Sequence, residues 1–189
     1  MAELGQVGGK DVHLWIASNG PDTERLRAQS AGDARIEWLG RLSDEEKISR
    51  LKGADVFCAP SLHGESFGVV LIEAMAAGTC IVASALDGYR NVATDDVDSV
   101  LVAPGDAHAL AKALERALSE EALASRLVKT GATRADDFSM TKLAERYAEI
   151  YRKVALPHPV SPRSVSAWPF MGRPRSTPRR RRLGRMLAQ

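Results

Sequence analysis

The sequence predicts an α/β fold in which helices flank a parallel β-sheet. Short apolar runs alternate along the chain with longer helical patterns, as in repeated βαβ units. Hydrophobic residues make up 44% and charged residues 26% of the 189 residues, which fits a globular protein with one principal core. No apolar run approaches the ~20 residues that span a membrane, and no signal peptide is evident. We therefore expect a cytoplasmic protein.

The first strand and helix are expected close to the start of the chain. The run Val-His-Leu-Trp-Ile-Ala at 12–17 is apolar enough for a buried strand, which would place Trp15 in the core. The few residues before it look like the end of a helix. An Asn-Gly-Pro turn at 19–21 follows the strand, and a polar helix is expected over 22–29. Pro21 suits the first helical position because the N–H there has no intrahelical partner.

The second strand and helix have a clearer boundary signal. The strand is expected at 36–39, with Trp38 in the core. Ser43 then caps a helix over 44–52, because Glu46 occupies the capping-box position three residues later.

The third strand and helix contain the segment on which the functional interpretation depends. A strand is expected at 56–59 and is stopped by Pro60. After a Gly-flanked turn, Ser66 is expected to cap a helix that runs to Ala77. Gly78 is placed to end this helix in a left-handed conformation.

The remaining elements complete the α/β pattern. Strands are expected at 81–84 and 100–102, and helices over 107–119, 121–136 and 139–154. The residues expected to form the packing stripe of the first of these helices are Leu110, Ala113, Leu114 and Ala117. Those expected to form the packing face of the last helix are Leu143, Tyr147, Ile150 and Tyr151.

The composition changes abruptly at residue 157. Residues 157–189 hold six of the nine prolines, eight arginines and no acidic residue, which leaves residues 1–156 with a net charge of about −6. A segment of this kind buries too little apolar area to offset its ordering entropy. We expect a folded domain over 1–156 and a disordered tail over 157–189. The Arg run at 179–182 suits anionic lipid headgroups or non-specific nucleic acid, or is part of a tail without a partner.

No metal site is expected. Cys58 and Cys80 lie in apolar strands, and neither has a second Cys or a His at zinc-ligand spacing, so both are expected to be buried free thiols. The Asp-Asp-Val-Asp run at 95–98 imitates a metal-binding D-x-D motif, but it lies in a polar loop between elements.

Two glutamates give the strongest functional signal. Glu65 lies in a turn flanked by Gly64 and Gly68, and Glu73 follows eight positions later, about two turns down the next helix. The N-terminus of a helix binds phosphate through its free N–H groups and its dipole. Carboxylates accept hydrogen bonds from hydroxyl groups. The arrangement therefore predicts a site for a diphosphate-linked sugar.

The segment 55–84 resembles glycosyltransferase family 4, the retaining nucleotide-sugar transferases of the GT-B fold. The likeness rests on a strand ending in Ala-Pro-Ser at 59–61, the Glu-Ser-Phe-Gly turn at 65–68, and Glu-Ala-Met-Ala-Ala-Gly at 73–78 before another strand. It extends more weakly over 12–153 and does not include the tail. The resemblance implies a Rossmann-like donor-binding domain, the C-terminal half of a GT-B enzyme.

Three stretches resemble one group within that family, the actinobacterial phosphatidylinositol mannosyltransferases that use GDP-mannose. They are His-Gly-Glu-Ser-Phe-Gly at 63–68, Leu-Asp-Gly-Tyr-Arg at 86–90, and the Leu-Ser-Asp-Glu-Glu-Lys run that ends at Lys47. The resemblance implies retaining transfer of mannose from GDP-mannose to a phosphatidyl-myo-inositol acceptor. It also implies an enzyme that works peripherally at the inner face of the plasma membrane, without a metal or other cofactor.

The resemblance assigns roles to the glutamate segment. Glu65 would be the catalytic residue that hydrogen-bonds the transferred sugar and orients its anomeric carbon. The N–H groups of Ser66, Phe67 and Gly68 would hold the diphosphate and stabilise charge on the leaving group. Glu73 would bind the ribose hydroxyls, as an acidic residue does in other Rossmann-like sites.

The same resemblance places the nucleotide base beside a second group of residues. Lys47, with Leu42 and Asp44 nearby, would border the guanine, and Gly64 would complete the donor loop. Simpler interpretations stay open for three of the site residues. Glu65 would serve as a helix-capping acid, Glu73 would be a solvated acid, and Lys47 would be an ordinary surface lysine.

The resemblance also implies an incomplete active site. GT-B enzymes bind the acceptor with an N-terminal domain, and their donor domain begins with a strand and helix that supply an Arg and a Lys to the diphosphate. Neither part matches this chain, and the absent strand is a central one in the family's sheet. Each lost charge-assisted contact costs ~1.5–3 kcal/mol. We therefore expect the chain alone to bind donor weakly and to transfer no sugar.

Two other functions remain open on the sequence. One is a family 4 transferase that uses a UDP-sugar and another acceptor, against which Lys47 and the stretch 86–90 argue weakly. The other is a non-catalytic remnant that binds a nucleotide sugar or a protein partner.

Overall fold

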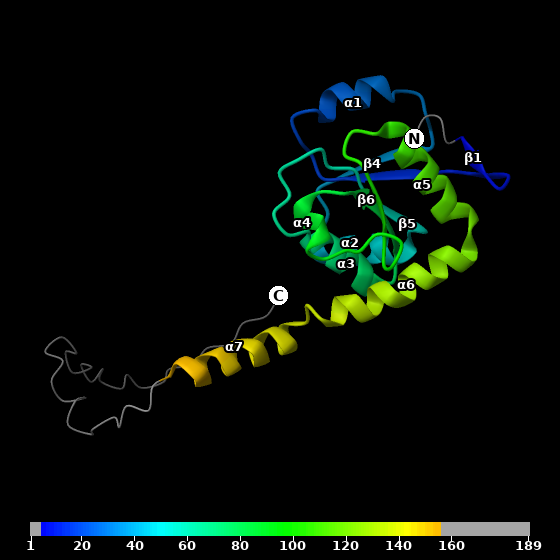
Figure 1. Ribbon diagram of the computed structural model, residues 1–189. Coiled ribbons are helices and arrows are strands. Elements are labelled where there is room, and N and C mark those ends of the chain that lie inside the picture. The colour runs from blue at the N-terminus through cyan, green and yellow to red at the C-terminus, as the bar shows by residue number, and fades with distance from the viewer. Residues whose placement is uncertain (1–4, 156–189) are drawn as a thin grey trace, which may run out of the picture. The chain divides into compact units, whose positions relative to one another are not determined.

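The computed structural model describes residues 5–155 of the chain (Figure 1). The strands are β1 (Gln6–Val7), β2 (Lys10–Asp11), β3 (Leu14–Ala17), β4 (Ile36–Gly40), β5 (Val56–Ala59), β6 (Cys80–Ser84) and β7 (Val100–Val102). The helices are α1 (Thr23–Gln29), α2 (Asp44–Gly53), α3 (Val69–Ala77), α4 (Asp87–Arg90), α5 (Ala107–Ser119), α6 (Glu121–Asp136) and α7 (Met140–Val154). The tail expected to be disordered lies outside the described residues.

The chain divides into two compact units, Met1–Tyr147 and Ala148–Gln189, and the boundary falls within α7. Every strand and the helices α1 to α6 belong to the first unit. In the part of the chain that the structure describes, no helix combines the length and the apolar composition needed to cross a bilayer.

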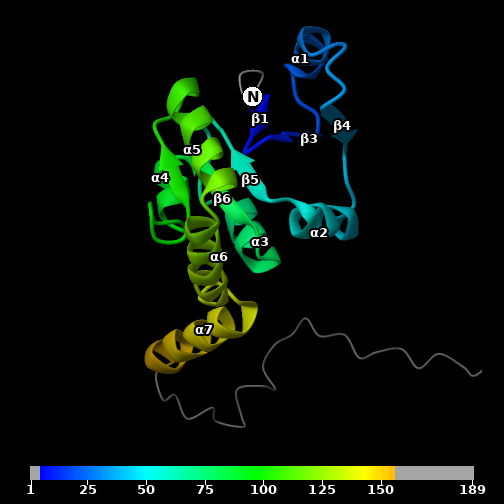
Figure 2. The same cartoon turned by 90° about the vertical axis from the view of Figure 1, so that its right-hand side faces the viewer.

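The strands form three sheets, two of them parallel. β5, β6 and β7 make a three-stranded parallel sheet in that order, and β3 pairs in parallel with β4. These are the five strands expected from the sequence, and their parallel pairing with flanking helices confirms the predicted α/β class. In Figure 2, β3, β4 and α1 lie on one side of β5 and β6, with α4, α5 and α6 on the other. Among residues 5–155, no strand ladder joins β3 to β5.

The core is built on the two faces of β6. Ile81 and Ala83 pack in one apolar cluster with residues of α3, whereas Cys80 and Val82 pack in another with residues of α5 and α6. Alternate side chains of a strand point to opposite faces, so helices on both sides bury every residue of β6. The predicted stripe of α5 faces the second cluster, with Ala113, Leu114 and Ala117 buried and Leu110 packed against them.

Several expected boundaries are confirmed by their capping contacts. Ser43 and Glu46 form the predicted capping box, because Ser43 Oγ accepts from the Glu46 N–H at 3.2 Å and Glu46 Oε2 accepts from the Ser43 N–H at 2.8 Å. Gly78 follows α3 with φ 79°, the left-handed conformation expected of a terminating glycine. Pro21 lies one residue before Asp22, the N-cap of α1, rather than at the first helical position.

The segment before the first expected strand is a hairpin and not the end of a helix. β1 and β2 pair antiparallel around Gly8 and Gly9, which have φ 59° and 79°. Two left-handed residues in succession make the two-residue turn that matches the twist of a hairpin. Val7 packs against the cluster that contains Val82 and α5.

Neither strand tryptophan lies in the core, contrary to the expectation. The Trp15 ring is 40% exposed, and the Arg50 guanidinium lies 4.5 Å from its centroid. Trp38 is half-buried beneath Arg27, and its indole N–H donates to Ser30 Oγ at 3.3 Å. Both rings lie in the pair β3–β4, which has fewer covering elements than β6.

The expected packing face of α7 is also wrong in the described part of the chain. Helix α7 begins at Met140, one residue later than expected, and none of its residues is buried. Leu143 is 41% and Ile150 53% exposed, and the side chains of Tyr147 and Tyr151 are exposed as well. The helical period identified an amphipathic helix correctly, but period alone does not say what covers its apolar face.

Cys58 and Cys80 are free thiols, as expected. Cys80 is buried and Cys58 is half-buried, and burial raises the pKa of the Cys58 thiol to about 11. The loop carboxylates at 95–98 bind backbone and arginine groups. Asp98 accepts from the Thr94 N–H at 2.7 Å, Asp95 accepts from Leu101 at 2.9 Å, and Asp96 binds the Arg126 guanidinium at 3.1 Å.

A titration of Asp33 tests the local structure that precedes β4. The Asp33 carboxylate accepts from the Arg35 side chain at 2.9 and 2.7 Å and from its backbone N–H at 3.1 Å, and these bonds lower the pKa of Asp33 to about 2. Its contribution to stability is therefore present above the ordinary aspartate pKa of about 3.9 and is lost as the pH falls through about 2. We expect Arg35→Gln to raise the Asp33 pKa, measured by carboxyl NMR, toward the ordinary value. A midpoint near 3.9 in the wild type would contradict this prediction.

Candidate functional site: the glutamate turn and helix α3

The turn between β5 and α3 is closed by its own glutamate. Gly64 and Gly68 have φ 86° and 91°, and this left-handed backbone folds the segment back on itself. Glu65 Oε1 accepts a hydrogen bond from the Gly68 N–H at 3.1 Å and a longer one from the Phe67 N–H at 3.5 Å. The Glu65 carboxylate therefore lies at the N-terminus of α3, where a helix favours an anion.

This geometry corrects the expected start of the helix. Gly68 is the N-cap of α3, and the first helical residue is Val69, so Ser66 is not the cap. The Glu65 carboxylate binds the N–H groups at the helix start, and the helix begins two residues later than a Ser66 cap would place it. Ser66 and Phe67 are exposed in the turn.

Lys47 and Glu73 form an ion pair between two helices. Lys47 Nζ lies 2.7 Å from Glu73 Oε1, and both side chains are about a third exposed. The hydrogen bond that Lys47 donates to Glu73 raises the pKa of the Lys47 ammonium. The pair joins α2 to α3, and the segment that follows α3 is also held to α2, because Thr79 Oγ1 donates to the Leu51 carbonyl at 2.6 Å.

The other predicted base-pocket residues lie at the start of α2. Asp44 Oδ1 is 3.4 Å from Lys47 Nζ, and its own side chain is almost fully exposed. Leu42 precedes the capping Ser43 and is half-buried. The structure therefore gathers Lys47, Asp44 and Glu73 in one group, whose only strong internal contact is between Lys47 and Glu73.

Helix α4 supports the glutamate turn, and sequence reasoning did not predict this helix. Tyr89 is buried, its ring contacts the position of Gly68, and its hydroxyl lies 3.1 Å from Ser61 Oγ. Burial is the main factor that raises the pKa of the Tyr89 phenol, and the nearby Glu65 carboxylate acts in the same direction. Gly88 lies against the Glu65 backbone, because a Cβ at Gly88 would be 2.3 Å from the Glu65 carbonyl oxygen.

A further ring contact holds the turn on its other side. The Phe67 and Phe138 rings meet edge to face with centroids 5.8 Å apart, and the Arg134 guanidinium lies 4.6 Å from the Phe138 centroid.

The two residues of α4 that support the turn, Gly88 and Tyr89, lie in the stretch 86–90, which the sequence analysis had singled out without predicting a helix there. A helix of four residues has no period by which to recognise it.

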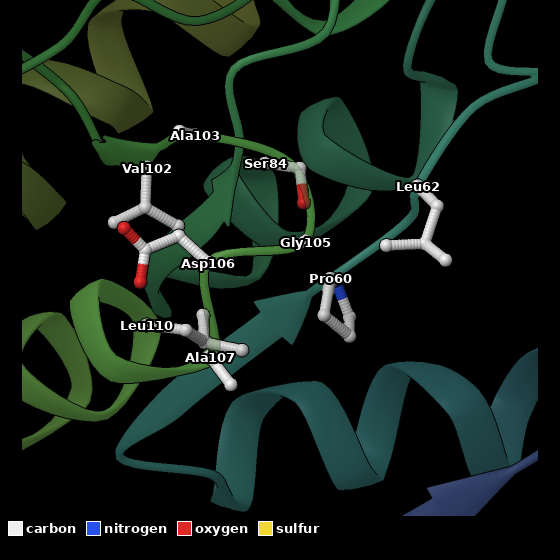
Figure 3. A pocket seen from close by; sticks show the side chains of 9 residues that line it. All are labelled: Pro60, Leu62, Ser84, Val102, Ala103, Gly105, Asp106, Ala107 and Leu110. Carbon is white, nitrogen blue, oxygen red and sulfur yellow. The ribbon is translucent and has the colours of Figure 1, made fainter.

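A hollow of about 190 Å³ lies at the carboxyl ends of the three-stranded sheet (Figure 3). The residues that line it are Pro60, Leu62, Ser84, Val102, Ala103, Gly105, Asp106, Ala107 and Leu110. Open α/β sheets bind ligands outside the carboxyl ends of their strands. However, the lining is largely apolar, the volume is below that of usual small-molecule sites, and none of the predicted site residues contributes to it. The glutamate turn is therefore the better candidate.

The arrangement at the turn is suited to an anionic ligand with hydroxyl groups. The backbone N–H groups at the start of α3 and the positive end of its dipole favour phosphate. Glu73 offers a second carboxylate further along α3, and Lys47 supplies a positive charge beside it. These are the groups needed to hold a diphosphate between a sugar and a ribose.

A comparison with protein families identifies the family of this chain. Residues 2–134 match the family described as glycosyl transferases group 1. The chain belongs to this family. Its glutamate turn, α3 and α4 all fall within the matched residues.

Relatives within the glycosyltransferases include mannosyltransferases. The chain is 43% identical over 146 residues to the phosphatidyl-myo-inositol mannosyltransferase of Mycobacterium leprae, a match that covers 77% of this chain and 39% of that protein. It is 36% identical to the MMP alpha-(1->4)-mannosyltransferase of Mycolicibacterium hassiacum, with 76% and 36% covered. The chain thus spans about two fifths of the length of these relatives.

Solved glycosyltransferase structures share the fold. Sucrose-phosphate synthase from Thermosynechococcus elongatus is 31% identical with a TM-score of 0.68, and the match covers 82% of this chain and 41% of that one. Anabaena Alr3699/HepE, solved with UDP-glucose, has a TM-score of 0.71 at 20% identity, with 81% and 44% covered. These likenesses agree with the predicted GT-B donor-domain fold.

A double-mutant cycle measures the Lys47–Glu73 contact in this glycosyltransferase chain. We expect Lys47→Met, Glu73→Gln and the double variant to give a coupling energy of about 0.5–1 kcal/mol in urea unfolding, the upper part of the range for partly exposed pairs. Because the folded-state pKa of Lys47 is raised, the coupling is present below the ordinary lysine pKa of about 10.4 and is lost as the pH rises through the folded value.

The exposed pair Arg25–Asp22, at 2.9 Å on the surface of α1, is the control for this cycle. Its coupling energy is expected to be smaller, because both of its side chains are more than half exposed. If the two pairs gave the same coupling energy, the Lys47–Glu73 contact between α2 and α3 would stabilise the fold no more than an exposed surface pair does.

Proposed function

We propose that this chain carries the donor-binding part of a retaining mannosyltransferase, which transfers mannose from GDP-mannose to a phosphatidyl-myo-inositol acceptor. The observation that carries the proposal is the glutamate turn at the N-terminus of α3, together with the ion pair between Glu73 of α3 and Lys47 of α2. The mannosyltransferase names of relatives at 36–43% identity support the choice of sugar.

In this proposal the residues at the turn act on charge and orientation. The N–H groups of Ser66, Phe67 and Gly68 bind the diphosphate and stabilise the charge that develops as GDP leaves. Glu65 accepts hydrogen bonds from the mannose hydroxyls. Because Glu65 Oε1 accepts from the Phe67 and Gly68 N–H groups, donor binding exchanges those two bonds for bonds to phosphate.

The nucleoside half of the donor is proposed to lie toward α2. Glu73 accepts from the ribose hydroxyls and remains oriented by Lys47. Lys47, Leu42 and Asp44 border the guanine, and Gly64 lets the loop approach the donor. No resident metal is proposed, because the helix N–H groups meet the diphosphate charge and the 95–98 carboxylates bind arginine and backbone groups instead.

Because the proposed acceptor is a membrane lipid, the reaction would take place at a membrane surface. We propose a cytoplasmic protein that acts peripherally at the inner face of the plasma membrane. The arginine run at 179–182 would add roughly 1 kcal/mol per residue of attraction to anionic lipid. Co-sedimentation of the chain with phosphatidylglycerol vesicles, compared with a variant ending at residue 156, tests this point.

Saturation-transfer NMR with GDP, GDP-mannose and UDP tests the donor. It detects millimolar binding, which is the range expected when one part of a site acts alone. We expect signals from GDP and GDP-mannose that weaken in Glu73→Gln, and no mannosyl transfer to phosphatidylinositol by the chain alone. A preference for UDP would support a UDP-sugar transferase, and no signal from any nucleotide would support a non-catalytic remnant.

A further inference from the structure

The Tyr89 hydroxyl is a polar group at the end of a buried side chain beneath the glutamate turn. The residue is 2% exposed, and its ring atoms Cδ1 and Cε1 lie 2.9 and 3.5 Å from the position that a Cβ on Gly68 would occupy. The hydroxyl lies 3.1 Å from Ser61 Oγ, and either oxygen can be the donor. A phenol donates one hydrogen bond and also accepts. When Ser61 donates to Tyr89, the phenol hydrogen is therefore left for a second acceptor.

The Glu65 carboxylate is the acidic group beside this hydroxyl. Its oxygen Oε1 accepts from the Phe67 and Gly68 N–H groups, which leaves Oε2 for another donor. The Tyr89 ring and the Glu65 carboxylate thus both contact Gly68. Burial is the main factor that raises the pKa of the Tyr89 phenol, and the Glu65 carboxylate also raises it. The phenol therefore keeps its proton at neutral pH and faces the carboxylate as a donor.

Helix α4 is fixed firmly enough for Tyr89 to orient another residue. The Tyr89 carbonyl accepts from the Val92 N–H at 3.0 Å and from the Ala93 N–H at 2.8 Å. The Arg134 guanidinium of α6 donates to the Val92 and Asn91 carbonyls at 2.8 and 3.0 Å, which fastens the end of α4 to α6. Residues that act on a ligand are held best by side chains whose own conformation is locked by packing.

Donor binding as proposed above removes the contacts that hold Glu65. The Phe67 and Gly68 N–H groups turn to the diphosphate, so Glu65 loses both of these partners when its orientation toward the sugar matters most. Loss of orientation at a reacting centre is costly even when the groups stay close. The buried Tyr89 hydroxyl is a donor that the diphosphate does not take, because the phosphate-binding N–H groups lie at the start of α3.

We propose that Tyr89 is the positioning residue of Glu65. When a diphosphate takes the Phe67 and Gly68 N–H groups, the Tyr89 phenol donates to the Glu65 carboxylate, and Ser61 donates to the phenol. One carboxylate oxygen is then fixed from beneath the turn, and the other is directed at the hydroxyl groups of the sugar. This inference rests on the proposed function, because it concerns Glu65 with a sugar diphosphate bound.

The arrangement gives Tyr89 an effect on one half of the donor only. The phenol acts through Glu65, which is proposed to bind the sugar. The nucleoside is proposed to lie beside Glu73 and Lys47, whose contact joins α3 to α2 and does not include α4. Loss of the phenol hydroxyl should therefore weaken recognition of the sugar and leave recognition of the nucleotide unchanged.

Titration of the Tyr89 phenol tests the contact without any nucleotide. Protein labelled with ¹³Cζ-tyrosine is followed by NMR, and Tyr89→Phe identifies the Tyr89 resonance. We expect Glu65→Gln to lower the phenol pKa, because a negative charge is removed, and Ser61→Ala to raise it, because the hydrogen bond from Ser61 favours the phenolate. Glu73→Gln is the matched control and is expected to leave the titration midpoint unchanged. No response to Glu65→Gln, or an equal response to Glu73→Gln, would overturn the proposal.

The wild type decides the contact if Glu65→Gln opens the turn, which amide exchange of residues 64–68 would report. The Glu65 Cδ resonance should then shift at the midpoint of the Tyr89 phenol titration, because ionisation of an adjacent hydroxyl changes the field at the carboxylate. A Glu65 Cδ resonance that does not respond at this midpoint would overturn the proposal.

Saturation-transfer NMR with GDP and GDP-mannose tests the positioning role. In Tyr89→Phe we expect the signals of the mannose protons to fall about threefold or more, as for the loss of one hydrogen bond, while the signals of GDP stay as in the wild type. An equal fall for both ligands would contradict the proposal, because Tyr89 would then support the turn as a whole. If the wild type binds neither ligand, the proposed function fails, whereas the phenol titration separately decides whether Tyr89 contacts Glu65.

Discussion

Replacing Tyr89 with alanine is expected to remove about 3–5 kcal/mol of stability and to unfold the glutamate turn before the rest of the domain. The tyrosine is 2% exposed and is among the largest fully buried side chains, so truncation leaves a cavity in the cluster shared with α3. Its ring also contacts Gly68, the N-cap of α3. Urea unfolding measures the loss, and amide exchange of residues 64–68 measures the turn.

Tyr89→Phe separates the ring from the hydroxyl. The phenylalanine keeps the packing against Gly68 and loses only the 3.1 Å contact with Ser61, so we expect a cost of about 1 kcal/mol. The exchange of the turn should then remain close to that of the wild type. If Tyr89→Phe were as damaging as Tyr89→Ala, the hydrogen bond to Ser61 and not the ring would support the turn.

Elements set by neighbouring residues were predictable from the sequence. The Ser43–Glu46 capping box depends on two residues three apart, and the left-handed Gly78 depends on one, so neither needs tertiary information. The hairpin around Gly8 and Gly9 also had a local signal. A Gly-Gly pair is a known two-residue turn, but strands of two residues are too short to show an alternating pattern.

Other features depended on contacts between distant segments. Ser66 is a good capping residue, but the Glu65 carboxylate reaches the helix start first and moves it to Gly68. Trp15 lies in an apolar run that predicts burial, yet among residues 5–155 its strand pairs with β4 alone. Burial of a strand depends on which elements lie beside it, and the residues of the strand do not record this.

The candidate site also has one part that the sequence predicted and another that depends on contacts between distant segments. The family resemblance implied that Glu65, Glu73 and Lys47 line one donor site, and the structure brings Lys47 and Glu73 within 2.7 Å. The Lys47–Glu73 contact joins residues 26 positions apart, and the residue types alone did not predict it. Their roles toward a donor stay predictions, because the contact that the structure shows for Glu65 is with the backbone of its own turn.

Gly88→Ala is expected to displace the glutamate turn by steric contact alone. A Cβ at this position would be 2.3 Å from the Glu65 carbonyl oxygen and 2.9 Å from the Ser66 carbonyl carbon, which are backbone atoms that cannot rotate away. Gly88 has no left-handed φ, so backbone strain adds nothing to the effect. Overpacking of this kind costs about 1–3 kcal/mol. Urea unfolding measures this cost, and faster amide exchange is expected in residues 64–68.

Gly53→Ala is the matched control, because a Cβ there meets no atom within 4 Å and its φ is not left-handed. We expect its stability to stay within about 0.5 kcal/mol of the wild type. The same comparison applies to the saturation-transfer signal of GDP-mannose, which should fall in Gly88→Ala and persist in Gly53→Ala. If both variants kept wild-type stability and exchange, α4 would not position the turn, and the Phe67–Phe138 contact would remain as its support.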